Sequence, residues 1–110
     1  MKKEKMNKKE KGKQLELWVL SHFKDDKLAR LSRGSGNSND IGDIVTSDYY
    51  FEAKNWNRDC VTLSMKTWNH LINQMPINTN KIAIYVYQNK KGKKFVIMNA
   101  EDFFRKIRQE

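Results

Sequence analysis

The sequence predicts an α/β fold, in which helices cover a mixed central sheet, and two observations support this prediction. Segment 82–87, which reads IAIYVY, is an unbroken apolar and aromatic run, as is typical of a strand buried on both faces. A segment with helical spacing comes shortly before it, and such a helix can cross over between parallel strands. Because a chain of 110 residues can build one modest core, we expect a single domain.

The first half of the chain predicts a helix followed by three strands. Residues 1–11 hold six lysines, two glutamates and little that is apolar, so we expect a flexible basic arm ahead of a folded domain that spans 12–110. From Lys13, apolar residues recur at helical spacing until Asp25 and Asp26 end the pattern. Three short apolar segments then predict an antiparallel meander of strands, at 28–33, 41–45 and 49–53.

The second half predicts another helix, the central strand, and an added strand and helix. The first helix is expected to begin after Ser64 or Thr62 as its cap and to end at Pro76. Its apolar residues lie three and four positions apart, which predicts a stripe that faces the core: Met65, Trp68, Leu71, Ile72 and Met75. The elements expected after the central strand are a turn around Gly92, an edge strand at 95–98 and a closing helix at 100–107.

The chain is strongly basic. It has 22 Lys plus Arg against 13 Asp plus Glu, and its formal net charge is +9. A surplus of this size attracts polyanions, so nucleic acid is the favoured partner. The alternative is that the lysines serve solubility alone.

Cysteine and histidine supply no chemistry in our interpretation. The single cysteine, Cys60, can form neither an internal disulfide nor a four-ligand zinc site, which fits a reducing cytoplasm. His22 and His70 each stand alone on a segment with a helical pattern, and we interpret both as ordinary helix residues. Because no long apolar run follows the Lys-rich start, we expect neither a signal peptide nor a membrane span.

Three charged residues can form a metal site on the predicted meander. Glu52 and Lys54 are two apart on a strand, so their side chains leave the same face, while Phe51 and Ala53 pack on the other. Asp43 begins the preceding strand, and a hairpin can bring its carboxylate beside that of Glu52. Two carboxylates with a backbone carbonyl suit Mg²⁺, for which Mn²⁺ is expected to substitute. Lys54 would orient or deprotonate a water and stabilise the charge of a phosphodiester transition state.

Taken together, these motifs resemble the PD-(D/E)XK nuclease superfamily, with its restriction-endonuclease-like core of element order αβββαβ. The segments GKQLELWVLSHF, RGSGNSND, GDI and FEAKNW, within residues 12–88, are similar to those of small Holliday junction resolvases of the phage and archaeal types. The resemblance implies that Asp43 and Glu52 bind the metal. It also implies that Lys54 is the catalytic lysine and that Glu16 is an accessory carboxylate.

Two of these assignments have alternatives. Asp40 is a second candidate for the metal ligand, but it can also cap the loop through its own backbone, and Asp43 is closer to Glu52 in the sequence. Gly42 stands where the family often has a proline before the aspartate. Glu16 is alternatively an ordinary exposed glutamate of a helix.

The loop rich in Gly, Ser and Asn is the predicted phosphate contact. Its glycines allow the backbone to approach a phosphate closely, although the same composition is typical of a disordered connector. Trp56 either flanks the nucleic acid or covers the core, and Gln74 either orients the site or is a solvated helix residue. The predicted nucleic-acid contacts are Arg33, Ser35, Asn37, Ser38 and Arg58.

The resemblance therefore implies a Mg²⁺-dependent endonuclease that cuts four-way DNA junctions. Because a junction has two equivalent strands to cut, a twofold homodimer is the expected assembly. Two alternatives are a nicking or restriction-type endonuclease on the same fold, and a DNA-binding protein that keeps the scaffold without catalysis.

Overall fold

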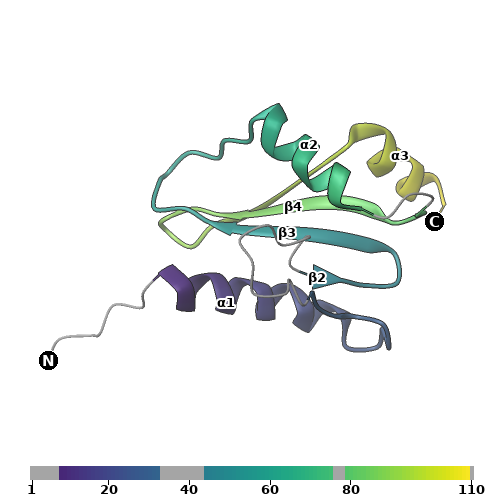
Figure 1. Cartoon of the computed structure of the whole chain (residues 1–110), viewed down its shortest axis with the longest axis horizontal. Helices are drawn as coiled ribbons and strands as arrows, with labels where there is room; N and C mark the ends of the chain where they lie inside the picture. Colours follow the sequence, from purple (N-terminus) through teal and green to yellow (C-terminus); the bar gives the residue numbers. More distant parts are fainter. Residues whose placement is uncertain (1–7, 33–43, 76–78, 110) are drawn as a thin grey trace, which may run out of the picture.

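The computed structural model describes residues 8–32, 44–75 and 79–109, which form one mixed sheet with helices on both sides (Figure 1). In chain order the elements are helix α1 (Lys8–Leu20), 3₁₀-helix η1 (Ser21–Phe23), strands β1 (Arg30–Leu31), β2 (Ile44–Val45) and β3 (Tyr49–Asn55), helix α2 (Met65–Gln74), strands β4 (Ile82–Gln88) and β5 (Lys94–Met98), and helix α3 (Ala100–Arg108). This order confirms the predicted α/β fold, including the added strand and helix after the central strand.

The sheet has the strand order β1-β2-β3-β4-β5. Strands β1, β2 and β3 pair antiparallel, which confirms the predicted meander. Strand β4 pairs parallel with β3 and is reached through α2, as expected of a helical crossover, and β5 pairs antiparallel with β4 as an edge strand. Helix α1 lies on one side of the sheet, and α2 and α3 lie on the other (Figure 1).

Helix α1 begins earlier than the sequence predicted. It starts at Lys8, so residues 8–11 of the predicted arm are helical, while residues 1–7 lie outside the described residues. Lysine and glutamate are good helix formers, and the helix is anchored further along by the buried side chains of Leu15 and Val19. It gives way to η1 before Asp25, where the hydroxyl of Ser21 donates a hydrogen bond to the Trp18 carbonyl at 2.6 Å.

The main core lies between α1 and the sheet. Leu15 and Val19 of α1 pack against one apolar cluster, which contains the strand residues Ile44, Phe51, Ile82, Ile84 and Val86. Because successive side chains of a strand point to opposite faces, this side, the α1 face, takes alternate residues of β4. The other side, the α2 face, therefore takes Ala83, Tyr85 and Tyr87, which are also buried. The sequence-based prediction of a central strand buried on both faces is confirmed.

The turn between β2 and β3 is held by side-chain hydrogen bonds. The buried hydroxyl of Thr46 accepts from the amides of Asp48 at 3.2 Å and Tyr49 at 3.0 Å. The carboxylate of Asp26 accepts from the Ser47 amide at 2.9 Å and from the Ser47 hydroxyl at 2.7 Å. These two hydrogen bonds hold the pKa of Asp26 below its ordinary value, and the bond from the Ser47 hydroxyl has the larger effect. Asp26 thus links the segment after η1 to the β2–β3 turn.

Helix α2 has the predicted cap but not the predicted burial. The Ser64 hydroxyl accepts from the Thr67 amide at 3.1 Å, which confirms Ser64 as the N-cap. Of its apolar stripe, only Leu71 is buried, whereas Met65 is 67% exposed and Ile72 is 41% exposed. The prediction that the whole stripe faces the core is wrong, because α2 meets the sheet along only part of its length, over β4.

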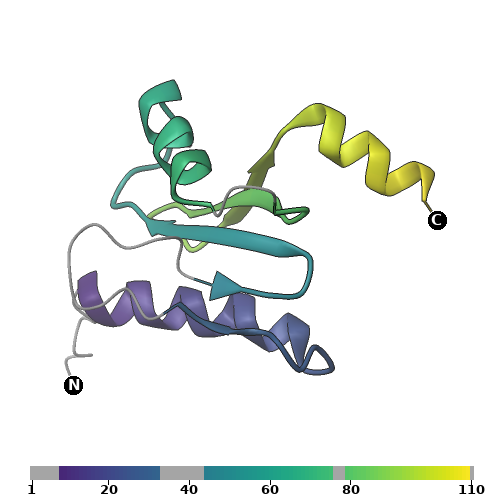
Figure 2. The ribbon, with the colours of Figure 1, turned by 45° about the vertical axis from the view of Figure 1, so that its right-hand side comes forward.

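Helix α3 forms as predicted but does not close over the core. Asn99 caps it by accepting from the amides of Glu101 and Asp102. None of its residues is buried, and the side chains of Phe103, Phe104 and Ile107 are each 45% to 54% exposed. In the turned view of Figure 2, α3 leads away from the sheet after β5. An apolar stripe is therefore left without cover among the described residues.

Candidate nucleic-acid interface

Strand β3 presents its two charged side chains on the α2 face. Glu52 pairs with Tyr85 and Lys54 pairs with Tyr87, while Phe51 packs in the core on the α1 face. This confirms the shared face that the period of two predicted for the pair. Glu52 is half-buried and Lys54 is exposed, so the ammonium group of Lys54 is accessible to a ligand from solvent.

Lys54 lines an open hollow of about 1210 Å³ on the α2 face, which we call the Lys54 hollow. Its lining comes from the end of β3, the segment that follows β3, α2 and β4. Besides Lys54, it includes Trp56, Tyr85 and the α2 residues Lys66, Asn69, His70 and Asn73. A hollow with two cations, two amides and an exposed indole offers hydrogen-bond donors, positive charge and a stacking surface to a nucleic acid.

The α2 residues of this hollow were missed by the sequence analysis, which assigned no chemistry to His70. The polar side chains of Lys66, His70 and Asn73 are four and three positions apart, a spacing that places them on one helical face. That polar stripe, opposite the apolar one, was the signal. The side-chain amide of Gln74 lies 2.5 Å from Nε2 of His70, so Gln74 contacts a residue of the hollow.

Arg58 lies in the segment that joins β3 to α2, and this segment is tied to the β4–β5 turn. The guanidinium carbon of Arg58 is 5.8 Å from the centroid of the Trp56 ring. The Arg58 carbonyl accepts from the Lys90 amide at 2.9 Å, and the Trp56 amide donates to the Gln88 carbonyl at 3.0 Å. The hydroxyl of the buried Tyr87 donates to the Cys60 carbonyl at 2.7 Å. Arg58 is exposed on a segment held in place by these bonds.

Several predicted site residues lie outside the described part of the chain. These are the metal ligand Asp43, its alternative Asp40, and the loop residues Arg33, Ser35, Asn37 and Ser38. Their predicted roles stay predictions. Within residues 8–32, 44–75 and 79–109, no three His, Cys, Asp or Glu side chains form a group that could hold a metal.

Glu16 does not share a face with Glu52. It is half-buried on α1, and α1 covers the side of the sheet opposite to the one that carries Glu52 and Lys54. The accessory role that the resemblance implied for Glu16 stays a prediction.

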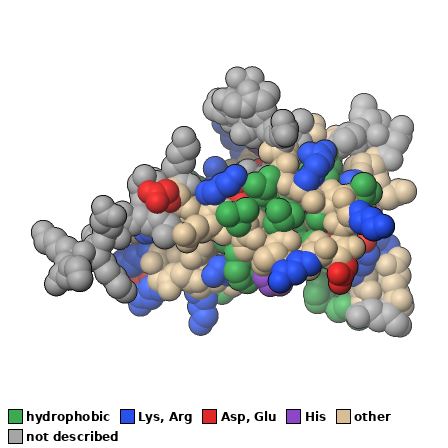
Figure 3. Space-filling model, turned by 90° about the horizontal axis from the view of Figure 1, so that it is seen from below, with side chains coloured by type: hydrophobic (Ala, Val, Ile, Leu, Met, Phe, Trp, Pro, Cys, Tyr) green, Lys and Arg blue, Asp and Glu red, His purple; other side chains and the backbone are tan. Residues whose placement is uncertain are grey.

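The surface of the described chain carries more basic than acidic side chains. Figure 3, which views the molecule from below, shows many Lys and Arg side chains and few Asp and Glu. Among the described residues, no helix is long and apolar enough to cross a membrane. Searches against protein families, curated proteins and solved structures returned no match for the chain.

Proposed function

We propose that the chain is a Mg²⁺-dependent DNA endonuclease that cuts four-way junctions. The observation that carries this proposal is the placement of Glu52 and Lys54 side by side on one face of β3, where Lys54 opens into a polar, basic hollow. The order of elements around this pair also agrees with the αβββαβ core of the resembling nucleases.

Asp43 and Glu52 are the proposed metal ligands. Asp43 directly precedes Ile44 in the sequence, and Ile44 pairs with Phe51, which directly precedes Glu52. Carboxylate oxygens are hard ligands, so this donor set fits Mg²⁺ and also Mn²⁺. When bound, such an ion activates water and stabilises negative charge on phosphate oxygens.

Lys54 is the proposed catalytic lysine. Its ammonium group would orient the attacking water and, by its charge, stabilise the additional negative charge on the phosphoryl oxygens in the transition state. The water oxygen forms a bond to phosphorus and gives up one proton, while the bond from phosphorus to the leaving oxygen breaks and that oxygen takes up one proton, so the products are a phosphomonoester and an alcohol. The cations of the Lys54 hollow would hold the backbone of the DNA beside this pair.

A twofold homodimer is the proposed assembly, because two equivalent strands of a junction are then cut by two sites. The uncovered apolar side chains of α3 are the candidate contact, since a stable interface has an apolar centre.

A cleavage assay tests the function. A four-way junction and a linear duplex with the same arm sequence are incubated with the protein in Mg²⁺ and in chelator. Paired cuts in the junction, in Mg²⁺ only, are expected. Equal cutting of both substrates would favour the nicking or restriction-type endonuclease, and DNA binding without cutting would favour the non-catalytic DNA-binding protein.

A further inference from the structure

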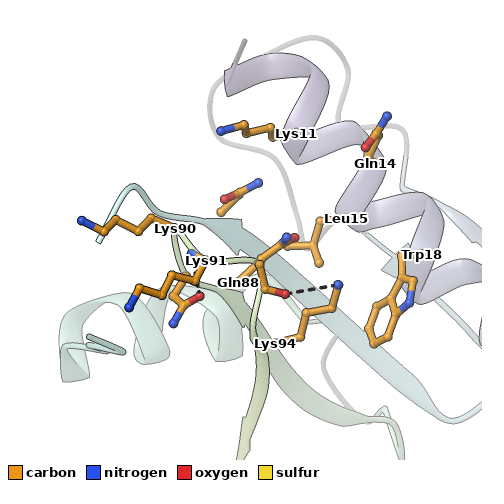
Figure 4. A pocket seen from close by; sticks show the side chains of 11 residues that line it. Lys11, Gln14, Leu15, Trp18, Gln88, Lys90, Lys91 and Lys94 are labelled. Carbon is orange, nitrogen blue, oxygen red and sulfur yellow. Dashed lines mark hydrogen bonds between the residues drawn. The ribbon is translucent and has the colours of Figure 1, made fainter. Parts of the chain in front are cut away.

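A second hollow, of about 460 Å³, lies between α1 and the β4–β5 turn (Figure 4). Four lysines line it and give it the name lysine hollow: Lys11, Lys90, Lys91 and Lys94. Lys11 comes from the first turns of α1, whereas the other three come from the turn and from β5, about 80 positions later in the sequence. The described lining contains no Asp or Glu. The fold therefore gathers positive charge that the sequence keeps apart.

The turn that carries these lysines is fixed by its own hydrogen bonds. The buried side chain of Asn89 accepts from the amides of Lys91 at 3.0 Å and Lys93 at 2.9 Å, and it donates to the Asp59 carbonyl at 3.3 Å. Gly92 adopts a φ of 84°, which is the left-handed conformation that glycine accepts most readily. The lysines thus stand on a preorganised backbone, and a ligand would not have to order it.

The four ammonium groups have no acidic partners in the part of the chain that the structure describes. The ammonium of Lys94 instead lies 4.8 Å from the centroid of the exposed Trp18 ring. Neighbouring cations repel one another, and this repulsion is relieved when an anion binds between them. The hollow is accordingly suited to a ligand with several negative charges.

The lysine hollow and the Lys54 hollow lie on opposite faces of the sheet, at the same end of it. Lys54 and Asn55 are neighbours on β3, so their side chains point to opposite faces, and Lys54 lines one hollow while Asn55 lines the other. The hydrogen bond from the Lys90 amide to the Arg58 carbonyl joins the segments beside the two hollows. A branched polyanion could contact both sides of this end at once.

We propose that the lysine hollow binds the phosphate backbone of a second DNA arm, while the arm to be cut lies in the Lys54 hollow. This inference rests on the proposed action on four-way junctions. Duplex DNA carries one negative charge per about 1.7 Å of its axis, so several of its phosphates can reach the lysines of the hollow at once. Lysine is a point charge on a flexible stem, so the contact reads the backbone and not the bases.

Binding measurements with a double variant test the proposal. Lys90→Ala/Lys91→Ala removes two charges but keeps the backbone amides on which the turn depends, and Lys24→Ala/Lys27→Ala is the matched control, because both of its lysines are exposed and line neither hollow. Affinity for a four-way junction and for a linear duplex is measured by fluorescence anisotropy in chelator over a salt series.

We expect Lys90→Ala/Lys91→Ala to weaken junction binding about tenfold and to lower the slope of log K against log salt by about 1.8, which is about 0.9 for each lost phosphate contact. Duplex binding should fall less, by threefold at most, because a linear duplex fills one hollow at a time. Equal losses on junction and duplex, or a junction loss no greater than that of the control, would overturn the inference. So would competition by polyglutamate as strong as that by duplex, since it would assign the hollow to an acidic protein.

The indole resonance of Trp18 locates the contact, since Trp18 lines the lysine hollow. In ¹⁵N spectra, assigned with Trp18→Phe, the junction should shift this resonance in the natural protein but not in Lys90→Ala/Lys91→Ala at equal saturation. An unshifted resonance in the natural protein would contradict the inference.

If these binding results hold but Mg²⁺ supports no cleavage, the nuclease proposal fails and the second-arm site stands. If junctions are cut but the double variant behaves as its control, only the second-arm site fails.

Discussion

The two faces of the sheet differ in what they bury. On the α1 face, Leu15 and Val19 close over a continuous apolar cluster. On the α2 face, the strand residues include Tyr85, Tyr87 and the Glu52–Lys54 pair, and α2 buries only Leu71. Apolar side chains of α2 and α3 stay exposed on that side.

This difference separates stability from function. Apolar burial on the α1 face contributes to the folding free energy, because that energy scales with the apolar area removed from water. Charged side chains would be costly there. The α2 face can carry them, since its hollow leaves Lys54 in contact with solvent. Substitutions on the two faces should therefore have different consequences.

The largest effect is expected at the charged pair. Glu52→Gln and Lys54→Ala should each lower junction cleavage by about 10³-fold or more, or about 4 kcal/mol of transition-state stabilisation, with little change in melting temperature. Single-turnover cleavage and thermal melting measure both. Lys27→Ala is the control, and near-natural cleavage by Lys54→Ala would contradict the catalytic role.

The same assay decides between the two aspartates. Asp43→Asn should lower cleavage as much as Glu52→Gln does, because it removes a proposed metal ligand. DNA binding should be unchanged or tighter, because a negative charge near the phosphate is removed. If Asp40→Asn abolishes cutting and Asp43→Asn does not, Asp40 is the metal ligand.

The α1 face should respond in stability. Leu15→Ala removes a fully buried side chain and is expected to lower the free energy of unfolding by about 2–5 kcal/mol. Met65→Ala, on the exposed part of α2, should change it by less than about 0.5 kcal/mol. Urea denaturation measures both. Similar losses at the two positions would show that the faces do not differ in stability.

The exposed stripe of α3 tests whether a second copy covers it. Phe104→Ser should weaken the proposed dimer by about tenfold or more, because burying a phenylalanine contributes roughly 1.5–3 kcal/mol. Analytical ultracentrifugation measures the dissociation constant. Leu28→Ser is the control, since Leu28 is 63% exposed and lies between η1 and β1, outside the α3 stripe. A monomeric natural protein would exclude the homodimer.

The β4–β5 turn should show a smaller effect. Gly92→Ala is expected to lower the free energy of unfolding by about 1–2 kcal/mol, because φ at Gly92 is 84°, a left-handed conformation that alanine rarely adopts. The added methyl itself would not clash, since it would meet only the Gln88 side chain, at 3.7 Å. Gly12→Ala is the opposite control. Gly12 lies inside α1 with nothing within 4 Å of the added methyl, so alanine should stabilise by up to about 1 kcal/mol. Chemical denaturation of both variants checks the signs, and a Gly92→Ala variant as stable as the natural protein would contradict the prediction.

The smallest effect is expected at Asp26, which joins the end of the α1 face to the β2–β3 turn. Its pKa is lower in the folded protein, so its stabilising contribution is present above its ordinary pKa of 3.8 and is lost as pH falls through the folded value. Asp26→Asn should lower the melting temperature at pH 7, and the difference from the natural protein should shrink below pH 3.8. Asp25→Asn removes the same charge without the Ser47 hydrogen bonds, and an equal effect there would contradict this account.

Local features of the sequence determined the order of the elements, the cap at Ser64, the turn at Gly92 and the shared face of Glu52 and Lys54. Each of these features depends on the spacing of side chains along the chain or on the backbone preference of one residue. Residues close together in the sequence are enough to determine both. The αβββαβ order and the central strand were predictable for the same reason.

Only the tertiary structure decided which of these elements bury their apolar faces and which charges meet. The stripes of α2 and α3 have the same spacing as that of α1, but burial depends on the surface an element packs against, and that surface is distant in the sequence. The same reason explains why His70 lies in the hollow with Lys54, and why Lys11 meets the lysines of the β4–β5 turn. Periodicity sets which side chains share a face, and packing between distant segments sets what that face meets.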